Sequence, residues 1–293
     1  MAATDSPQKP DIAGFYHGPT SSCCFVVGDP ATGACAIIDS VLDFDPVSAR
    51  TATDFADSLV DHVRAQRLRV DWILETHIHA DHLSAAPYLK DVLGGQVAIG
   101  DHIGEVQEAF CDIFNVEDGF RADGSQFDRL LKDGERFAVG AVEALAMRTP
   151  GHTPACMSYR IGDAVFVGDT LFMPDYGTAR CDFPGGSARE IYRSIRRLLA
   201  LPPDTRIFVG HDYAPGGRPV AWETTVAQQR AANKHVRDGI DEASFVKMRT
   251  DRDAELDLPA LILPAIQVNM RAGQLPPTED NGVRYIKIPL NTF

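Results

Sequence analysis

The chain has 293 residues, of which 44% are hydrophobic and 24% charged, and its formal net charge at pH 7 is −13. A chain of this length can bury a substantial core, as one large domain or two small ones. The acidic balance disfavours binding to nucleic acid or to an anionic membrane, because both partners attract basic surfaces.

The cellular setting is predicted from three further absences. No run of about 18 apolar residues occurs, so no membrane span is expected. The N-terminal residues are polar and lack the apolar core of a signal peptide. The cysteines contain no CxxC pair, which is typical of reduced proteins, and we expect a cytoplasmic location. They are Cys23, Cys24, Cys35, Cys111, Cys156 and Cys181.

The first half of the chain mixes strands and helices. The apolar runs 23–29 and 34–39 predict two strands joined by a Pro-Ala-Thr-Gly turn. Apolar residues at four-residue spacing predict a helix over 51–67. The nearly continuous apolar run 70–76 predicts a buried strand. A helix, a strand and a second helix are then expected at 85–95, 96–100 and 102–116.

From about residue 135 the pattern changes to short strands separated by tight turns. Ser187 and Glu190 form a capping-box pair ahead of a predicted helix that ends at Leu199. A strand is expected at 205–210 and a helix at 222–237. Mixed sheets covered by outer helices fit this order, which predicts an α+β fold. The four short strands are expected at 135–140, 141–148, 156–162 and 164–169.

The last part of the chain has a different composition. Residues 258–277 combine a long apolar run with four prolines. We expect an extended arm packed on the body or on a partner subunit. The predicted division is a principal domain at 1–240 and a C-terminal extension at 241–293.

A dense group of metal-capable side chains follows the strand predicted at 70–76. It comprises His77, His79, Asp81 and His82. Imidazole and carboxylate groups are ligands for zinc, iron and manganese, and a strand end holds them rigidly. A solvated polar loop is the alternative explanation.

Three later residues, His152, Asp169 and His211, each follow a predicted apolar strand in the same way. Strands that each end at a histidine or an aspartate indicate one sheet edge that collects ligands. This repetition disfavours the solvated loop. The remaining histidines have no such context and are expected to be ordinary; they are His17, His62, His102 and His235.

Four motifs in this order resemble those of the metallo-β-lactamase superfamily. They are THIHADH, TPGHT, GDTLF and VGHDY. The resemblance covers roughly residues 14–235. It implies a four-layer αββα sandwich with a C-terminal extended arm and a metal site at the edge between the two sheets. Residues 1–240 would then form the catalytic domain.

The stretches around these motifs, HADHLSAAPYLK and GDTLFMPDYGTARCDFPGGS, are similar to those of the persulfide dioxygenases. The C-terminal tail resembles that of the β-lactamase-hydrolase-like group. This resemblance implies oxidation of glutathione persulfide by O₂ to sulfite and glutathione. It also implies one non-haem Fe(II) per chain, held by His77, His152 and Asp169, and a homodimer. Two histidines and one carboxylate form the facial triad of such iron sites.

The other site residues receive roles from the same resemblance and from their chemistry. His79 and His82 would orient ligands by hydrogen bonds. Asp81 and His211 would lie around the ligands or bind a second metal. Tyr213, directly after the VGHD sequence, is a candidate catalytic residue, and a packed tyrosine at a strand end is the alternative.

Two arginines are candidates for substrate binding. Arg180, and less strongly Arg218, would bind a glutathione carboxylate, since the guanidinium fork suits that group. A plain exposed arginine is the alternative for both. Cys181 beside Arg180 is interpreted as a buried cysteine rather than a reactive thiol.

Other functions remain open from the sequence. A glyoxalase-II-type thioester hydrolase would share the fold and the ligands but use a dinuclear site, with zinc as the alternative metal. A metal-dependent nuclease of the same superfamily is disfavoured by the net charge. A non-catalytic sensor is disfavoured by the complete ligand set.

Overall fold

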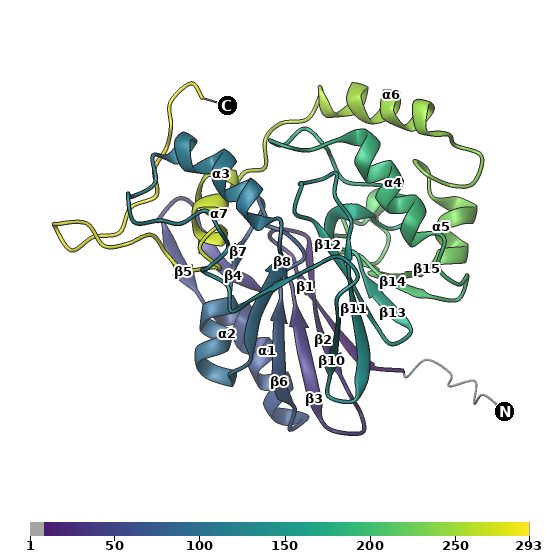
Figure 1. Cartoon of the computed structure of the whole chain (residues 1–293), viewed down its shortest axis with the longest axis horizontal. Coiled ribbons are helices and arrows are strands. Elements are labelled where there is room, and N and C mark those ends of the chain that lie inside the picture. The colour runs from purple at the N-terminus through teal and green to yellow at the C-terminus, as the bar shows by residue number, and fades with distance from the viewer. Residues whose placement is uncertain (1–8, 293) are drawn as a thin grey trace.

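The computed structural model describes residues 9–292 as two facing sheets with helices on both outer faces (Figure 1). The first sheet has the strand order β1-β2-β3-β6-β8-β9 and the second the order β10-β11-β12-β13-β14-β15. A small third sheet, β5-β4-β7, lies beside the first. The predicted four-layer αββα sandwich is therefore confirmed.

The elements have the following bounds. The first sheet contains β1 (Asp11–His17), β2 (Ser22–Gly28), β3 (Ala34–Ile38), β6 (Arg69–Leu74), β8 (Gln96–Gly100) and β9 (Arg129–Leu131). The second contains β10 (Arg136–Val139), β11 (Val142–Arg148), β12 (Met157–Ile161), β13 (Ala164–Phe166), β14 (Arg206–Phe208) and β15 (Glu223–Thr225). The third contains β4 (Val41–Asp45), β5 (Arg50–Ala52) and β7 (Leu83–Ser84). The α-helices are α1 (Asp54–Ala65), α2 (Ala86–Leu93), α3 (Ile103–Phe114), α4 (Ala188–Leu198), α5 (Val226–Ala232), α6 (Glu242–Asp253) and α7 (Ile262–Asn269).

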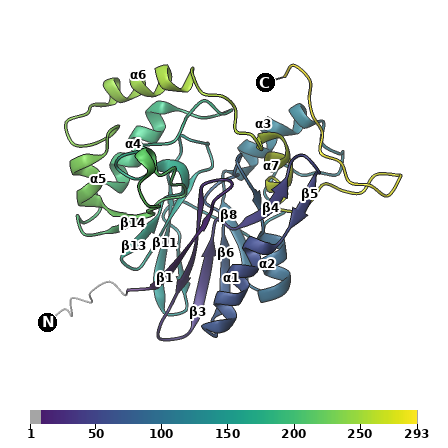
Figure 2. The same ribbon diagram turned by 180° about the vertical axis from the view of Figure 1, so that it is seen from behind.

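The central strands are apolar throughout because both of their faces are covered. In β2, Cys24 and Val26 pack outward with α1, α2 and α3, whereas Phe25 and Val27 pack into the layer between the sheets. This is the alternation that a strand imposes on successive side chains. On the other side, α4 and α5 cover the second sheet, and α6 lies beyond them (Figure 2).

The helix predicted at 222–237 is wrong at both of its ends. Glu223–Thr225 form the edge strand β15, and the Thr225 side chain then caps α5 in a capping box with Gln228. At the other end, the Asn233 side chain accepts hydrogen bonds from the backbone amides of His235 and Val236, which closes a turn. Local side-chain bonds therefore override the apolar spacing.

The expected extended arm is also partly helical. Residues 242–253 form α6 and Ile262–Asn269 form α7, and no helix follows α7 up to residue 292. Pro264 lies in the first turn of α7, where its missing amide hydrogen is not needed, so it does not prevent the helix. The four prolines of residues 258–277 therefore did not predict an extended structure correctly, because a proline in the first turn is compatible with a helix.

Helix α7 holds the loop that contains the histidine motif. The Asn269 side-chain amide donates to the carbonyls of His79 and His82, at 2.9 and 2.8 Å. Its side-chain oxygen accepts from the Ser84 amide at 2.8 Å. A residue far along the chain thus satisfies three backbone groups of this loop, all buried.

We expect Asn269→Ala to destabilise the protein by about 1–3 kcal/mol and to loosen the histidine loop, because three buried backbone groups lose their partner. Gln267→Ala is the matched control, since Gln267 on the same helix bonds to Leu263 and to Lys287 of the tail instead. Denaturant unfolding and metal titration of both variants check this. Equal metal affinities in the two variants would contradict it.

Candidate metal centre

The predicted ligands come from four loops at one edge of the sandwich. His77 follows β6, His152 lies between β11 and β12, Asp169 lies in the 3₁₀ turn Gly168–Thr170 after β13, and His211 follows β14. A backbone bridge between Ser22 and His211 connects the two sheets at this edge. The fold therefore brings together residues that are far apart in the sequence.

His77, His152 and Asp169 form one buried group whose ligand atoms all lie within 4.8 Å of one another. The Asp169 Oδ2 atom is 4.0 Å from His77 Nε2 and 3.8 Å from His152 Nε2. His77 Nε2 and Asp169 Oδ1 are buried and, within residues 9–292, have no hydrogen-bond partner. Such atoms are rare in proteins, and a cation between them would satisfy both. The donor set therefore fits a metal ion.

Hydrogen bonds set both histidines of this group in the form that binds metal. His152 Nδ1 donates to the Arg180 carbonyl at 2.8 Å. His77 Nδ1 lies 3.0 Å from Thr76 Oγ1, which itself donates to Asp39 at 2.8 Å. Each Nε2 atom is then left unprotonated and faces Asp169. Burial lowers the pKa of His77 well below its usual value and keeps this imidazole neutral.

One ring nitrogen of His79 is held by two buried carboxylates. Its Nε2 atom lies 3.1 Å from Asp39 Oδ1 and 3.3 Å from Glu75 Oε2. Burial opposes a charge on His79, but the Asp39 and Glu75 carboxylates outweigh it and raise its pKa well above the usual value. The ligand atoms within 4.8 Å of one another therefore come from His77, His152 and Asp169, while the buried Nδ1 atom of His79 has no hydrogen-bond partner in residues 9–292.

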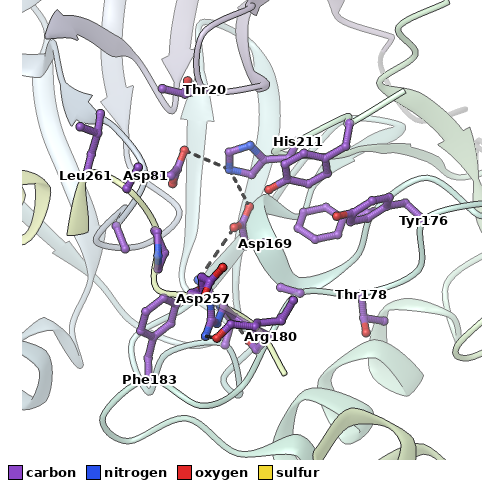
Figure 3. A pocket seen from close by; sticks show the side chains of 18 of the residues that line it. Thr20, Asp81, Asp169, Tyr176, Thr178, Arg180, Phe183, His211, Asp257 and Leu261 are labelled. Atoms are coloured by element: carbon purple, nitrogen blue, oxygen red, sulfur yellow. Dashed lines mark hydrogen bonds and ion pairs between the residues drawn. The ribbon is translucent and has the colours of Figure 1, made fainter. Parts of the chain in front are cut away.

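A second position for a cation is less complete. His211 Nε2 lies 3.4 Å from both Asp81 Oδ2 and Asp169 Oδ1 (Figure 3). His82, however, turns its Nδ1 atom onto Asp81 at 3.0 Å and lies 3.3 Å from Ser22 Oγ. Asp81 and His211 are thus brought together beside Asp169, while His82 groups with Asp81 and His79.

Two glycines allow the loops to approach one another. Gly168 has φ 48°, and a Cβ atom there would collide with the Thr76 side chain. Gly151 has φ 136°, and a Cβ atom there would collide with the backbone of Ile191 in α4. Both positions need a residue without a side chain, in a conformation that favours glycine. The glycines of TPGHT and GDT therefore set the close packing that places His152 and Asp169.

A pocket of about 370 Å³ opens onto this group, within the size range of small-molecule sites. Tyr213 lines it and stacks on Tyr176, with ring centroids 4.5 Å apart. Desolvation, and then the charges of Asp169 and Asp81, raise the pKa of Tyr213, so its hydroxyl stays protonated at neutral pH. Figure 3 shows Tyr176 and Phe183 on either side of the cavity below His211 and Asp169.

The two predicted substrate arginines are placed differently. Arg180 lines the pocket, but its guanidinium already bonds both Asp182 oxygens at 2.6 Å and the Asp257 carbonyl at 2.6 Å. Arg218 lies outside the lining, and all five of its donors are occupied by Asp175, Asp212 and the Pro219 carbonyl. Arg218 therefore anchors the loop after His211 and has no donor left for a substrate.

The sequence interpretation missed the residues that orient the ligands and those that close the pocket. Asp39 lies in none of the quoted motifs, and Thr76 begins THIHADH but received no role, because single aspartates and threonines at strand ends are common. The pocket wall at residues 256–261 belongs to the predicted C-terminal extension, for which the sequence indicated no role. Cys181 is buried as expected, and burial raises the pKa of its thiol, which disfavours the reactive thiolate.

Comparison with known proteins identifies a family for the chain. Residues 17–211 match the Metallo-beta-lactamase superfamily. The chain is 57% identical to a probable metallo-hydrolase of Burkholderia pseudomallei, over 96% of this chain and 99% of that protein. It is 29% identical to the mitochondrial persulfide dioxygenase ETHE1 of Homo sapiens, over 88% of this chain and 87% of that protein. The crystal structure of ETHE1 from Myxococcus xanthus superposes with a TM-score of 0.71 at 27% identity, covering 90% of this chain and all of that chain.

In the described part of the chain, no helix is long and apolar enough to cross a membrane. The motifs, the αββα layers and the match over residues 17–211 lead to one conclusion: the chain belongs to the metallo-β-lactamase superfamily.

Proposed function

We propose that this protein is a glutathione-dependent persulfide dioxygenase that uses O₂ to oxidise glutathione persulfide to sulfite and glutathione. The observation that carries the proposal is the composition of the buried ligand group. The ligand atoms of His77, His152 and Asp169 all lie within 4.8 Å of one another, and His79 is not a member of that group. Two histidines and one carboxylate are typical of non-haem Fe(II) oxygenases. The similarity to the human persulfide dioxygenase supports the same assignment.

Each group of site residues would have a separate role in the reaction. His77, His152 and Asp169 would hold one Fe(II), which supplies the redox chemistry with O₂ when bound. The Tyr213 hydroxyl would donate a hydrogen bond to the persulfide or to oxygen beside it. The rings of Phe172 and Tyr176 pack with Tyr213 and form an aromatic side of the pocket. Asp39 and Thr76 would keep His77 in its binding tautomer.

A thioester hydrolase with two metal ions is the second candidate. His211 Nε2, Asp81 Oδ2 and Asp169 Oδ1 lie close enough to share a further cation. The 57% identical relative is named as a probable metallo-hydrolase, which also favours this class. The two functions differ in metal number and in their need for O₂.

We expect anaerobically purified protein to bind one iron per chain and to consume O₂ with glutathione persulfide, releasing sulfite. His77→Ala should lose the iron, because it removes one of three ligands. His82→Ala should retain it, because His82 lies outside the ligand group. Metal analysis, an oxygen electrode and a sulfite assay measure these outcomes. Two zinc ions per chain, half of them lost in His211→Ala, with cleavage of S-lactoylglutathione would establish the hydrolase instead.

We expect Thr76→Val to weaken iron binding about 10–100-fold, because His77 loses the hydrogen bond that fixes its tautomer. Thr149→Val is the matched control. Thr149 is equally buried but bonds to Ser158 and Thr170 rather than to a ligand. Iron titration in the presence of a competing chelator gives both affinities. If the two variants bind iron equally well, the proposed role of Thr76 is wrong.

We expect Tyr213→Phe to lower kcat about tenfold at unchanged iron content, because one hydrogen bond of about 1.4 kcal/mol is removed. Tyr192→Phe serves as the control, since the Tyr192 hydroxyl bonds to the Ile240 carbonyl away from the pocket. O₂ uptake at saturating substrate measures the change. Unaltered kcat in Tyr213→Phe would show that this hydroxyl takes no part.

A further inference from the structure

The outer wall of the pocket is built by the end of α6 and the segment that follows it. Arg252, Leu256, Asp257 and Leu261 line the same cavity as Asp169 and His211. A substrate whose sulfur reached the ligand group would extend past these residues. They are therefore placed to select the part of the substrate that lies away from the sulfur, an argument that rests on the proposed function.

This wall carries positive charge in a chain whose net charge is −13. Arg249 and Arg252 both line the cavity. Lys234 lies nearby, with its Nζ atom 5.1 Å from the centre of the Tyr176 ring. Burial, followed by the charge of Arg252, lowers the pKa of Lys234. An anion in the outer pocket would be attracted by these cations.

Most cations of this region already have partners. Arg249 is 1% exposed and bonds to Asp253 at 2.8 Å and to the Thr178 carbonyl at 3.2 Å. Arg180 is occupied by Asp182 and the Asp257 carbonyl. These two arginines therefore hold the wall together and have few donors to offer a ligand.

Arg252 is the exception. It is exposed, and between residues 9 and 292 its guanidinium forms no hydrogen bond or ion pair. The Asp257 carboxylate lines the same cavity, but it is not ion-paired with Arg252. A solvated guanidinium at the edge of a small-molecule pocket is free to form the two parallel bonds that a carboxylate accepts.

We propose that Arg252 binds a carboxylate of the substrate, and so selects persulfides that carry an acidic group remote from the sulfur. Glutathione, with two carboxylates, belongs to this chemical class. Arg252 thereby replaces Arg180 and Arg218 as the carboxylate-binding residue. Lys234 adds long-range attraction without direct contact being required.

Binding of S-methylglutathione to the iron-loaded protein tests the proposal, because this compound carries both carboxylates and cannot be turned over. Its diethyl ester, which lacks the charges, is the comparison ligand. We expect Arg252→Gln to weaken binding of the free acid about tenfold and to leave binding of the ester unchanged. Arg252→Lys should fall between, since it keeps the charge and loses the fork. Isothermal titration calorimetry measures the affinity of each protein for each ligand.

Arg237→Gln is the matched control, because it removes one exposed arginine that does not line the pocket. Thermal unfolding confirms that the variants are folded. The proposal is overturned if Arg252→Gln binds the free acid as well as the wild type does. It is also overturned if wild-type protein binds acid and ester equally, or neither of them, or if both ligands weaken alike in the variant. Failure of the persulfide activity itself is recognised separately, by the absence of O₂ uptake in the wild type.

Discussion

The buried carboxylate of Asp39 is the constraint on which the site depends. It accepts hydrogen bonds from the Thr76 amide at 2.7 Å, from the Thr76 hydroxyl at 2.8 Å and from His79 Nε2 at 3.1 Å. Through Thr76 it fixes the tautomer of His77, and by its contact with His79 Nε2 it fixes the orientation of that ring. One acceptor thus positions two histidines of the motif. Positioning groups around a metal commonly have this influence on affinity and activity.

Opposite charges and hydrogen bonds offset the free-energy cost of burying Asp39 and Glu75. Asp39, Glu75 and His79 are all less than 5% exposed. Ser84 donates a hydrogen bond to Glu75, and His79 lies between the two carboxylates. A buried carboxylate without such partners would be costly, because burial disfavours its charge. Removing His79 would therefore leave two acids facing each other, in addition to any effect on the metal.

The sequence predicted those parts of the molecule that depend on local pattern. Alternating and continuous apolar runs located most strands, and the motifs located His77, His152 and Asp169, which the fold brings into one group. Contacts between distant segments could not be predicted in this way. Asn269 reaches His79 and His82 across nearly two hundred residues, and nothing in its neighbourhood signals that bond. The same holds for Arg180. The sequence predicted a guanidinium available to a substrate, but in the structure it bonds to Asp182 and to the Asp257 carbonyl. The helix α7 was missed because proline was weighed without its position in the turn.

The bonds from Asn269 also bear on the order in which the protein can be completed during synthesis. The histidine loop belongs to the first third of the chain, but its two carbonyls are tied only when residue 269 has emerged from the ribosome. Both sheets are complete by Thr225, so a nascent chain can form the sandwich before the loop is fastened. Metal binding in the final geometry is therefore a late event. A polypeptide that stops before α7 would contain every candidate ligand but would lack the Asn269 hydrogen bonds that hold the histidine loop.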